Sequence, residues 1–201
     1  MIAIIDYDAG NIKSVEKAIQ FLGGQTVLTR DPEEILKADH IILRGVGAFK
    51  DAMERLKYYK LVPVIKQAVS EKIPFLGICL GLQLLFESSE ESPGVEGLSL
   101  LPGKILRIPE GEGIKIPHIG WNSLSFPSQS VLFKEIPEES YVYFVHSYYL
   151  KAEDQEIVKA TTEYGVTIHA AVEQGALFGC QFHPEKSSEV GLKILQNFME
   201  Y

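Results

Sequence analysis

Residues 74–91 read PFLGICLGLQLLFESSEE, and this stretch decides the fold class. The apolar run 74–78 predicts a buried strand, and the leucine-rich segment after it predicts a helix over 80–91. The same pattern occurs earlier, with apolar runs at 2–6, 26–30 and 40–45 and amphipathic stretches at 11–24, 50–56 and 61–72. Strands that alternate with helices are typical of a parallel sheet covered on both faces.

The second half of the chain changes character. Strand-like pieces, separated by glycine, proline and acidic turns, occur at 104–109, 141–150, 156–164, 166–174 and 176–182. Their short spacing favours antiparallel or mixed pairing. A last amphipathic helix is expected over 187–201, capped by Ser187 or Ser188, and Asp31 is expected to cap a helix in the first half. With 201 residues, 46% of them apolar, residues 1–201 are expected to form one α/β domain.

Composition excludes several classes of function. The chain has 19 basic and 27 acidic residues and a net charge of −8, so nucleic acid is not an expected partner. The N-terminus lacks the pattern of a secretion signal, and no apolar run approaches the ~18 residues of a membrane span. A cytoplasmic chain without a membrane partner is therefore expected, with both cysteines as free thiols and Cys180 in the core.

The pentapeptide GICLG, residues 77–81, carries the sharpest chemical signal. It places Cys79 where a strand ends and a helix begins, between two glycines that permit a sharp turn, as in the G-x-S-x-G elbow of hydrolases. A helix N-terminus stabilises a thiolate, so this position suits a nucleophile. The alternative is an inert core cysteine.

A second signal is QFHPE, residues 181–185. His183 follows a strand, and Glu185 can return toward it after Pro184. A cysteine nucleophile requires a base that accepts its proton. That base works best when a carboxylate fixes its tautomer. Because catalytic groups gather at the carboxyl ends of parallel strands, the fold is expected to unite His183 with Cys79. The alternative is a solvated turn.

A third signal is GVGAF, residues 45–49. Its glycines can present backbone N–H groups to an oxyanion, with a second donor from the N–H of Leu80. A tight turn is the alternative. The segment is not a dinucleotide motif, because Lys50 stands where the third glycine would be.

Other candidates are weaker. The remaining histidines show no metal-ligand spacing, so neither a metal nor a cofactor is expected. The acidic run 87–91 is most simply a solvated helix end, although it lies close enough to the nucleophile to reach a cationic amino group. Trp121 suits either the core or a partner surface.

The combination of GICLG with a distant HPE resembles the class I glutamine amidotransferases, which release ammonia from glutamine through a cysteinyl thioester. Together with HIGWN and YFVHSYY, it is most similar to the glutaminase subunits of imidazole glycerol phosphate synthases. The resemblance runs from DYDAGNIKSV to FHPEKS, nearly the whole chain. It implies a flavodoxin-like three-layer fold, action on L-glutamine, and a separate (β/α)₈-barrel cyclase as the partner in a heterodimer.

The resemblance also implies roles for particular residues. Cys79 would be the nucleophile, His183 the general acid/base and Glu185 the residue that orients it. The remaining implied positions are Val46, Gly47 and Leu80 at the oxyanion; Gln83, Glu91, Ser147 and Tyr148 around glutamine; and Asn11, Trp121, Asn122, Tyr143 and Lys186 toward the cyclase.

Two positions depart from the family pattern, with Arg44 in place of a proline and Lys50 in place of a frequent glycine. Arg44 adds a cation near a site that must hold an oxyanion, so the expectation is intact triad chemistry with altered strand geometry or partner contact. The alternatives are a glutaminase subunit of another synthase, a γ-glutamyl hydrolase, and a catalytically weakened binding module.

Overall fold

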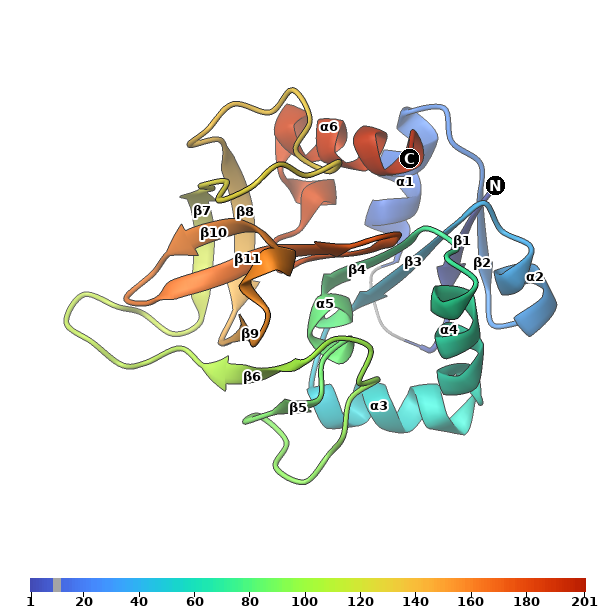
Figure 1. Cartoon of the computed structure of the whole chain (residues 1–201), viewed down its shortest axis with the longest axis horizontal. Coiled ribbons are helices and arrows are strands. Elements are labelled where there is room, and N and C mark those ends of the chain that lie inside the picture. The colour runs from blue at the N-terminus through green and yellow to red at the C-terminus, as the bar shows by residue number, and fades with distance from the viewer. Residues whose placement is uncertain (9–11) are drawn as a thin grey trace.

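The computed structural model describes residues 1–8 and 12–201, and its centre is a seven-stranded sheet (Figure 1). The strand order is β10-β11-β12-β4-β3-β1-β2. The five strands from β12 to β2 are parallel, and β10 and β11 continue the sheet antiparallel. The strand bounds are β1 Ile2–Ile5, β2 Thr26–Thr29, β3 His40–Gly45, β4 Phe75–Cys79, β10 Val158–Glu163, β11 Thr167–Gln174 and β12 Leu177–Cys180. The predicted parallel sheet with an antiparallel extension is confirmed.

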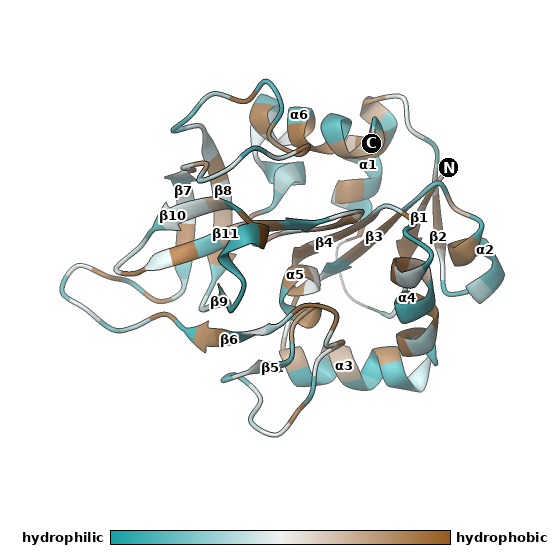
Figure 2. Cartoon of the chain, viewed as in Figure 1, coloured by the Kyte–Doolittle hydropathy of each residue, from teal (hydrophilic) through white to brown (hydrophobic). Residues whose placement is uncertain are grey.

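Helices cover both faces of this sheet, which makes three layers (Figure 1). Because side chains alternate along a strand, Ile2 and Ile4 pack toward α1 and α6, whereas Ala3 and Ile5 pack with the helices of the opposite face. The residues of β1, β3 and β4 are mostly apolar (Figure 2) and almost all of them are buried. The helix bounds are α1 Lys13–Phe21, α2 Pro32–Leu36, α3 Phe49–Tyr58, α4 Leu61–Ser70, α5 Leu80–Leu84 and α6 Ser188–Met199.

One of the predicted helix starts is confirmed and one falls outside the described part of the chain. Asp31 caps α2 as predicted, because its carboxylate accepts the N–H groups of Glu33 and Glu34. The predicted opening of the first helix at Asn11 lies outside the described residues.

The predicted helix over 80–91 is wrong beyond Leu84. The N–H groups of Gly97, Leu98 and Leu100 donate to the carbonyls of Glu87, Leu84 and Leu85. Those carbonyls are taken by another segment, so the helix ends and the acidic run forms the short strand β5 Ser88–Ser89 instead of a solvated helix end.

The predicted strand 141–150 is in fact two strands in different sheets. β8 Tyr141–His146 pairs with β7 His118–Ser123, whereas β9 Tyr148–Ala152 pairs with β6 Gly103–Arg107 beside β5. The change of partner falls at Ser147, and residues 145–148 around it line a cavity together with Cys79 at the end of β4.

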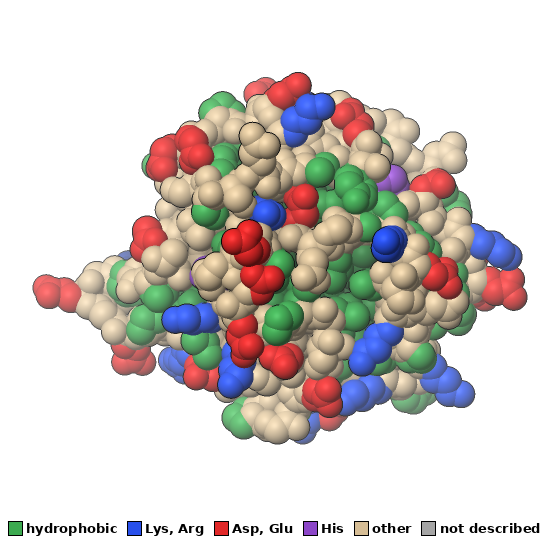
Figure 3. Space-filling model, in the orientation of Figure 1, with side chains coloured by type: hydrophobic (Ala, Val, Ile, Leu, Met, Phe, Trp, Pro, Cys, Tyr) green, Lys and Arg blue, Asp and Glu red, His purple; other side chains and the backbone are tan. Residues whose placement is uncertain are grey.

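The surface fits the acidic composition. On the face shown in Figure 3, acidic and basic side chains are interspersed without a continuous basic area. Among residues 1–8 and 12–201, no helix has the length and apolar character that crossing a bilayer requires.

Candidate active site

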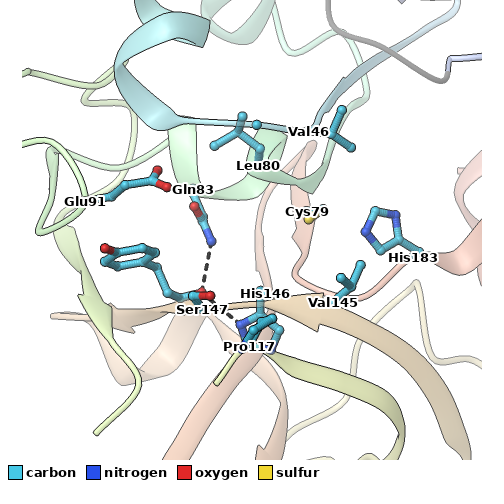
Figure 4. A pocket seen from close by; sticks show the side chains of 12 residues that line it. Val46, Cys79, Leu80, Gln83, Glu91, Pro117, Val145, His146, Ser147 and His183 are labelled. Atoms are coloured by element: carbon cyan, nitrogen blue, oxygen red, sulfur yellow. Dashed lines mark hydrogen bonds between the residues drawn. The ribbon is translucent and has the colours of Figure 1, made fainter. Parts of the chain in front are cut away.

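A cavity of about 320 Å³ opens beyond the carboxyl ends of β3, β4 and β12 (Figure 4). Segments from all three strand ends and from the turn between β8 and β9 meet there. Its lining comprises Val46, Gly47, Cys79, Leu80, Gln83, Glu91, Pro117, Val145, His146, Ser147, Tyr148 and His183. The fold therefore gathers in one cavity the residues that the sequence assigned to the nucleophile, the base, the oxyanion and the substrate.

Cys79 lies at the turn from β4 to α5 in a strained conformation, with φ 55° and ψ −111°. Such strain in a non-glycine residue is typical of functional sites. A Cβ on Gly81 would lie 1.9 Å from the carbonyl oxygen of Leu43, and a Cβ on Gly77 would lie 2.7 Å from the carbonyl oxygen of Gly81. The flanking glycines are thus required because α5 crosses the sheet in backbone contact, which places the sulfur at the helix N-terminus.

His183 approaches Cys79 from the segment after β12. Its Nδ1 lies 3.0 Å from Oε1 of Glu185, and both side chains are almost fully buried. Nε2 is on the side of the ring toward Cys79 (Figure 4) and makes no hydrogen bond of ordinary geometry with the described residues. Burial opposes protonation of the imidazole, but interactions with the Cys79 and Glu185 side chains outweigh it and raise the pKa of His183 to about 9.

The backbone around His183 is held by Ser187. The Ser187 hydroxyl donates to the carbonyl of His183 at 2.7 Å and accepts the N–H of Tyr143 at 2.9 Å, and the N–H of His183 donates to the carbonyl of Tyr143 at 2.9 Å. Ser187 occupies the predicted N-cap position of α6, but its hydroxyl makes no capping hydrogen bond and instead joins the base to β8.

Arg44, which the sequence placed near the oxyanion site, contacts the carboxylate of Glu185. Its side chain is 1% exposed, and Nε and Nη2 donate to Oε1 of Glu185 at 3.1 and 3.0 Å. Burial would raise the pKa of Glu185, but His183 and Arg44 together hold it below its usual range. Nothing in the sequence near residue 44 signals this contact, which joins residues 141 positions apart.

The other departure, Lys50, is on the solvent side of α3. Its ammonium lies 3.7 Å from the carboxylate of Glu54, one turn further along the helix. Both side chains are more than half exposed, so this ion pair contributes little.

The proposed oxyanion residues lie together on one wall of the cavity. Val46 and Gly47 follow β3, Leu80 begins α5, and the end of β3 pairs with the end of β4 through Gly45 and Cys79. Gly47 has φ +98°, a conformation that favours glycine.

Gln83 and Glu91 form the opposite end of the cavity. The Gln83 amide nitrogen donates to the carbonyl of Tyr148 at 3.0 Å and to Oε1 of Gln181 at 2.9 Å, so its oxygen is left as an acceptor on the Glu91 side (Figure 4). Oε2 of Glu91 accepts the N–H of Phe49 at 2.8 Å. One carboxylate and one amide oxygen at this end suit a cationic amino group.

Sequence reasoning missed Gln181. This fully buried residue donates from Nε2 to Sγ of Cys79 at 3.7 Å, and its oxygen accepts from Gln83. Only its place two residues before His183 in QFHPE distinguishes it in the sequence.

A buried histidine pair supports the cavity wall. Nδ1 of His146 lies 2.8 Å from the carbonyl of Tyr148, so it must donate, and His118 then donates from Nδ1 to Nε2 of His146 at 3.0 Å. Burial lowers the pKa of His118 to about 4 and that of His146 to about 3. Both rings are therefore neutral, structural hydrogen-bonding groups.

The residues assigned to the partner surface are on β7, β8 and the segment after His183. Trp121 is 50% exposed and packs edge-on against Tyr143 at 6.1 Å, and the ammonium of Lys186 lies 5.8 Å from the Tyr143 ring centre. Exposure places Trp121 at the surface rather than in the core. Asn122 donates to the carbonyl of Glu163, and Asn11 is outside the described residues.

Comparison with known proteins gives consistent matches over the whole chain. The protein family described as "Glutamine amidotransferase class-I" matches residues 3–201. The imidazole glycerol phosphate synthase subunit HisH of Moorella thermoacetica is 52% identical over 199 residues, which covers 99% of this chain and 94% of the relative. The protein of the same name from Streptococcus sanguinis is 49% identical over 201 residues, covering 100% and 96%.

Two solved structures share the fold. One, described as a glutamine amidotransferase, has a TM-score of 0.76 at 18% identity and covers 100% of this chain and 98% of its own. PurLQS from Thermotoga maritima has a TM-score of 0.73 at 22% identity, with coverage of 100% and 97%.

Proposed function

Because the chain belongs to the class I glutamine amidotransferase family, we propose that it is the glutaminase subunit of an imidazole glycerol phosphate synthase. In this role it hydrolyses L-glutamine to glutamate and ammonia in histidine biosynthesis, and residues 1–201 act as one glutamine amidotransferase domain. The observation that carries the proposal is that Cys79 and His183, 104 positions apart in the sequence, line one cavity, with Glu185 hydrogen-bonded to His183 behind it. Identity near 50% to synthase subunits over the full length supports the choice of synthase.

The proposed first step is attack on the side-chain amide of glutamine. The Cys79 thiolate adds to the amide carbon, backbone N–H groups of Gly47 and Leu80 hold the oxyanion, with Val46 beside them, and protonated His183 gives its proton to the departing ammonia. Retention of a proton by His183 near neutral pH suits this role, because its pKa is raised to about 9.

The second step is hydrolysis of the thioester that remains. His183, now neutral, takes a proton from water, which attacks the thioester carbon and releases glutamate from Cys79. Glu185 holds the donor tautomer at Nδ1 throughout, so Nε2 is the nitrogen that exchanges the proton.

Substrate orientation follows from the distribution of charge. The α-ammonium group of glutamine would lie between Glu91 and the oxygen of Gln83. Ser147 and Tyr148 would line the wall of the cavity across from the oxyanion residues. The amide then extends toward Cys79.

The partner in this proposal is a (β/α)₈-barrel cyclase that receives the ammonia. The exposed Trp121 and the half-buried Tyr143 that it packs against offer an apolar centre, with a polar border that includes Lys186 and Asn122. Asn11 is proposed for the same surface from the resemblance alone.

Glutamate production from glutamine, measured with the cyclase and its nucleotide ligand present, tests the proposal. Wild-type protein is expected to form glutamate, and Cys79→Ala is expected to form none while keeping the wild-type circular dichroism spectrum. Full activity in Cys79→Ala overturns the nucleophile assignment, and inactivity of the wild type with the cyclase overturns the choice of synthase.

A further inference from the structure

Arg44 has the largest side chain among those that are fully buried in residues 1–8 and 12–201. A guanidinium removed from water requires compensating charge and hydrogen bonds. Here the compensation comes from Glu185, the residue already assigned to orient the base, and both side chains are at most 1% exposed. The cation is therefore part of the electrostatics of the site.

The geometry gives Arg44 two contacts in the triad. Nε and Nη2 converge on Oε1 of Glu185, the same oxygen that accepts from Nδ1 of His183, and Nη2 lies 3.5 Å from that Nδ1. The carboxylate is thus held between imidazole and guanidinium, and its orientation is fixed from two sides.

A charge count explains why a cation is useful at this position. In the reactive form, a Cys79 thiolate, a His183 imidazolium and a Glu185 carboxylate sum to −1, and Arg44 brings the buried set to zero. A neutral buried set is far less costly than one with an uncompensated charge.

Three buried titratable groups near the triad add no charge at neutral pH. Burial raises the pKa of the Tyr7 hydroxyl after β1 and of the Cys180 thiol on β12, so both stay protonated. Burial lowers the pKa of His146 on β8 to about 3, so that ring is neutral. The charged groups closest to this set are more exposed or lie across the cavity. Arg55 is about half exposed, Lys186 is exposed, and Glu91 is at the opposite end of the cavity from His183 (Figure 4).

We propose that Arg44 is a positioning residue of the triad, which fixes the Glu185 carboxylate against His183 and balances the charge of the buried thiolate–imidazolium pair. This inference rests on the proposed function, because it assigns Arg44 a role in the same cysteine chemistry. It gives the cation at residue 44 a place in the triad, whereas the sequence led us to expect altered strand geometry or partner contact.

The inference predicts a direction for the pH dependence. Removing the cation makes Glu185 easier to protonate, so the acidic limb of the pH–rate profile moves to higher pH. It also removes a positive charge 3.5 Å from His183, so the imidazolium persists to higher pH and the basic limb moves upward too. Loss of a purely structural contact lowers the amount of folded protein without moving both limbs together.

The test uses Arg44→Met, with Arg44→Lys as the matched variant that keeps the charge. With wild-type activity established in the presence of the cyclase, Arg44→Met is expected to lower kcat about 10- to 100-fold with little change in KM, the scale of a displaced catalytic group. Both limbs are expected to move to higher pH by roughly one unit, as for loss of a charge beside each titrating group, opposite in sign to Glu185 and like in sign to protonated His183. Arg44→Lys is expected to restore the profile and most of kcat.

Two further measurements keep the test decisive. In a double-mutant cycle, Arg44→Met added to Glu185→Gln is expected to cause no further loss, because Arg44 acts through Glu185. The pH at which iodoacetamide alkylates Cys79 at half its maximal rate is expected to rise in Arg44→Met, and this readout needs no turnover. If Arg44→Met does not fold, Arg44→Gln replaces it in both measurements.

A neutral variant with wild-type kcat and an unmoved profile overturns the inference, as do independent effects of Arg44→Met and Glu185→Gln. Inactive wild-type protein instead overturns the proposed function, and the alkylation profile then still decides the role of Arg44.

Discussion

Substitution of Gly81 by alanine probes the contact that creates the nucleophile turn. The added Cβ would lie 1.9 Å from the carbonyl oxygen of Leu43, and ordinary contact begins near 3.4 Å, so α5 must move from β3 by about 1.5 Å. Leu80 and Cys79 are the residues immediately before Gly81, so the sulfur and the Leu80 N–H move as well.

Two magnitudes follow from this displacement. Overpacking against backbone costs about 1–3 kcal/mol, and the gain in helix propensity from glycine to alanine returns less than about 1 kcal/mol of it. A misplacement of this size at a reacting group lowers the rate by about 100-fold. Gly81→Ala is therefore expected to lose both stability and glutaminase activity.

Urea unfolding and glutamate production with the cyclase present measure the two effects. Gly111→Ala is the matched control, because its Cβ would lie 3.4 Å from the Ile114 side chain at an exposed position, and it is expected to change stability by less than about 0.5 kcal/mol. Wild-type stability and rate in Gly81→Ala would refute the argument that backbone contact between α5 and β3 sets the position of Cys79.

Three further outcomes are expected. Glu91→Gln keeps an oxygen for the N–H of Phe49 but loses the charge, so KM for glutamine is expected to rise about 10-fold in steady-state kinetics while kcat changes little. The depressed pKa values of His118 and His146 mean that the unfolded chain binds more protons below pH 6.5, so urea titrations are expected to show stability falling from pH 6.5 toward 4, and less steeply in His118→Gln. Trp121→Ala is expected to weaken cyclase binding about 10- to 100-fold by calorimetry without changing the melting temperature, because an exposed aromatic anchor contributes to binding and not to the core.

Local patterns were sufficient for the parallel part of the sheet. The apolar runs that became β1, β3 and β4 are buried on both faces. A strand of this kind requires a continuous apolar run, which can be recognised within a few residues of sequence. The same locality explains the failure after Leu84, where the leucine-rich pattern continues but the carbonyls are claimed by residues near position 98.

The sequence by itself determined the kinds of group at the site. Glycines on both sides of Cys79, and a histidine two residues before Glu185, are local features, so the turn and the base–carboxylate pair were readable in order along the chain. Tertiary structure alone decided which distant groups complete them. Arg44 reaches Glu185, and Gln181 reaches Cys79, through packing across neighbouring strands, and the free energy of such contacts depends on burial and distance that residue order does not encode.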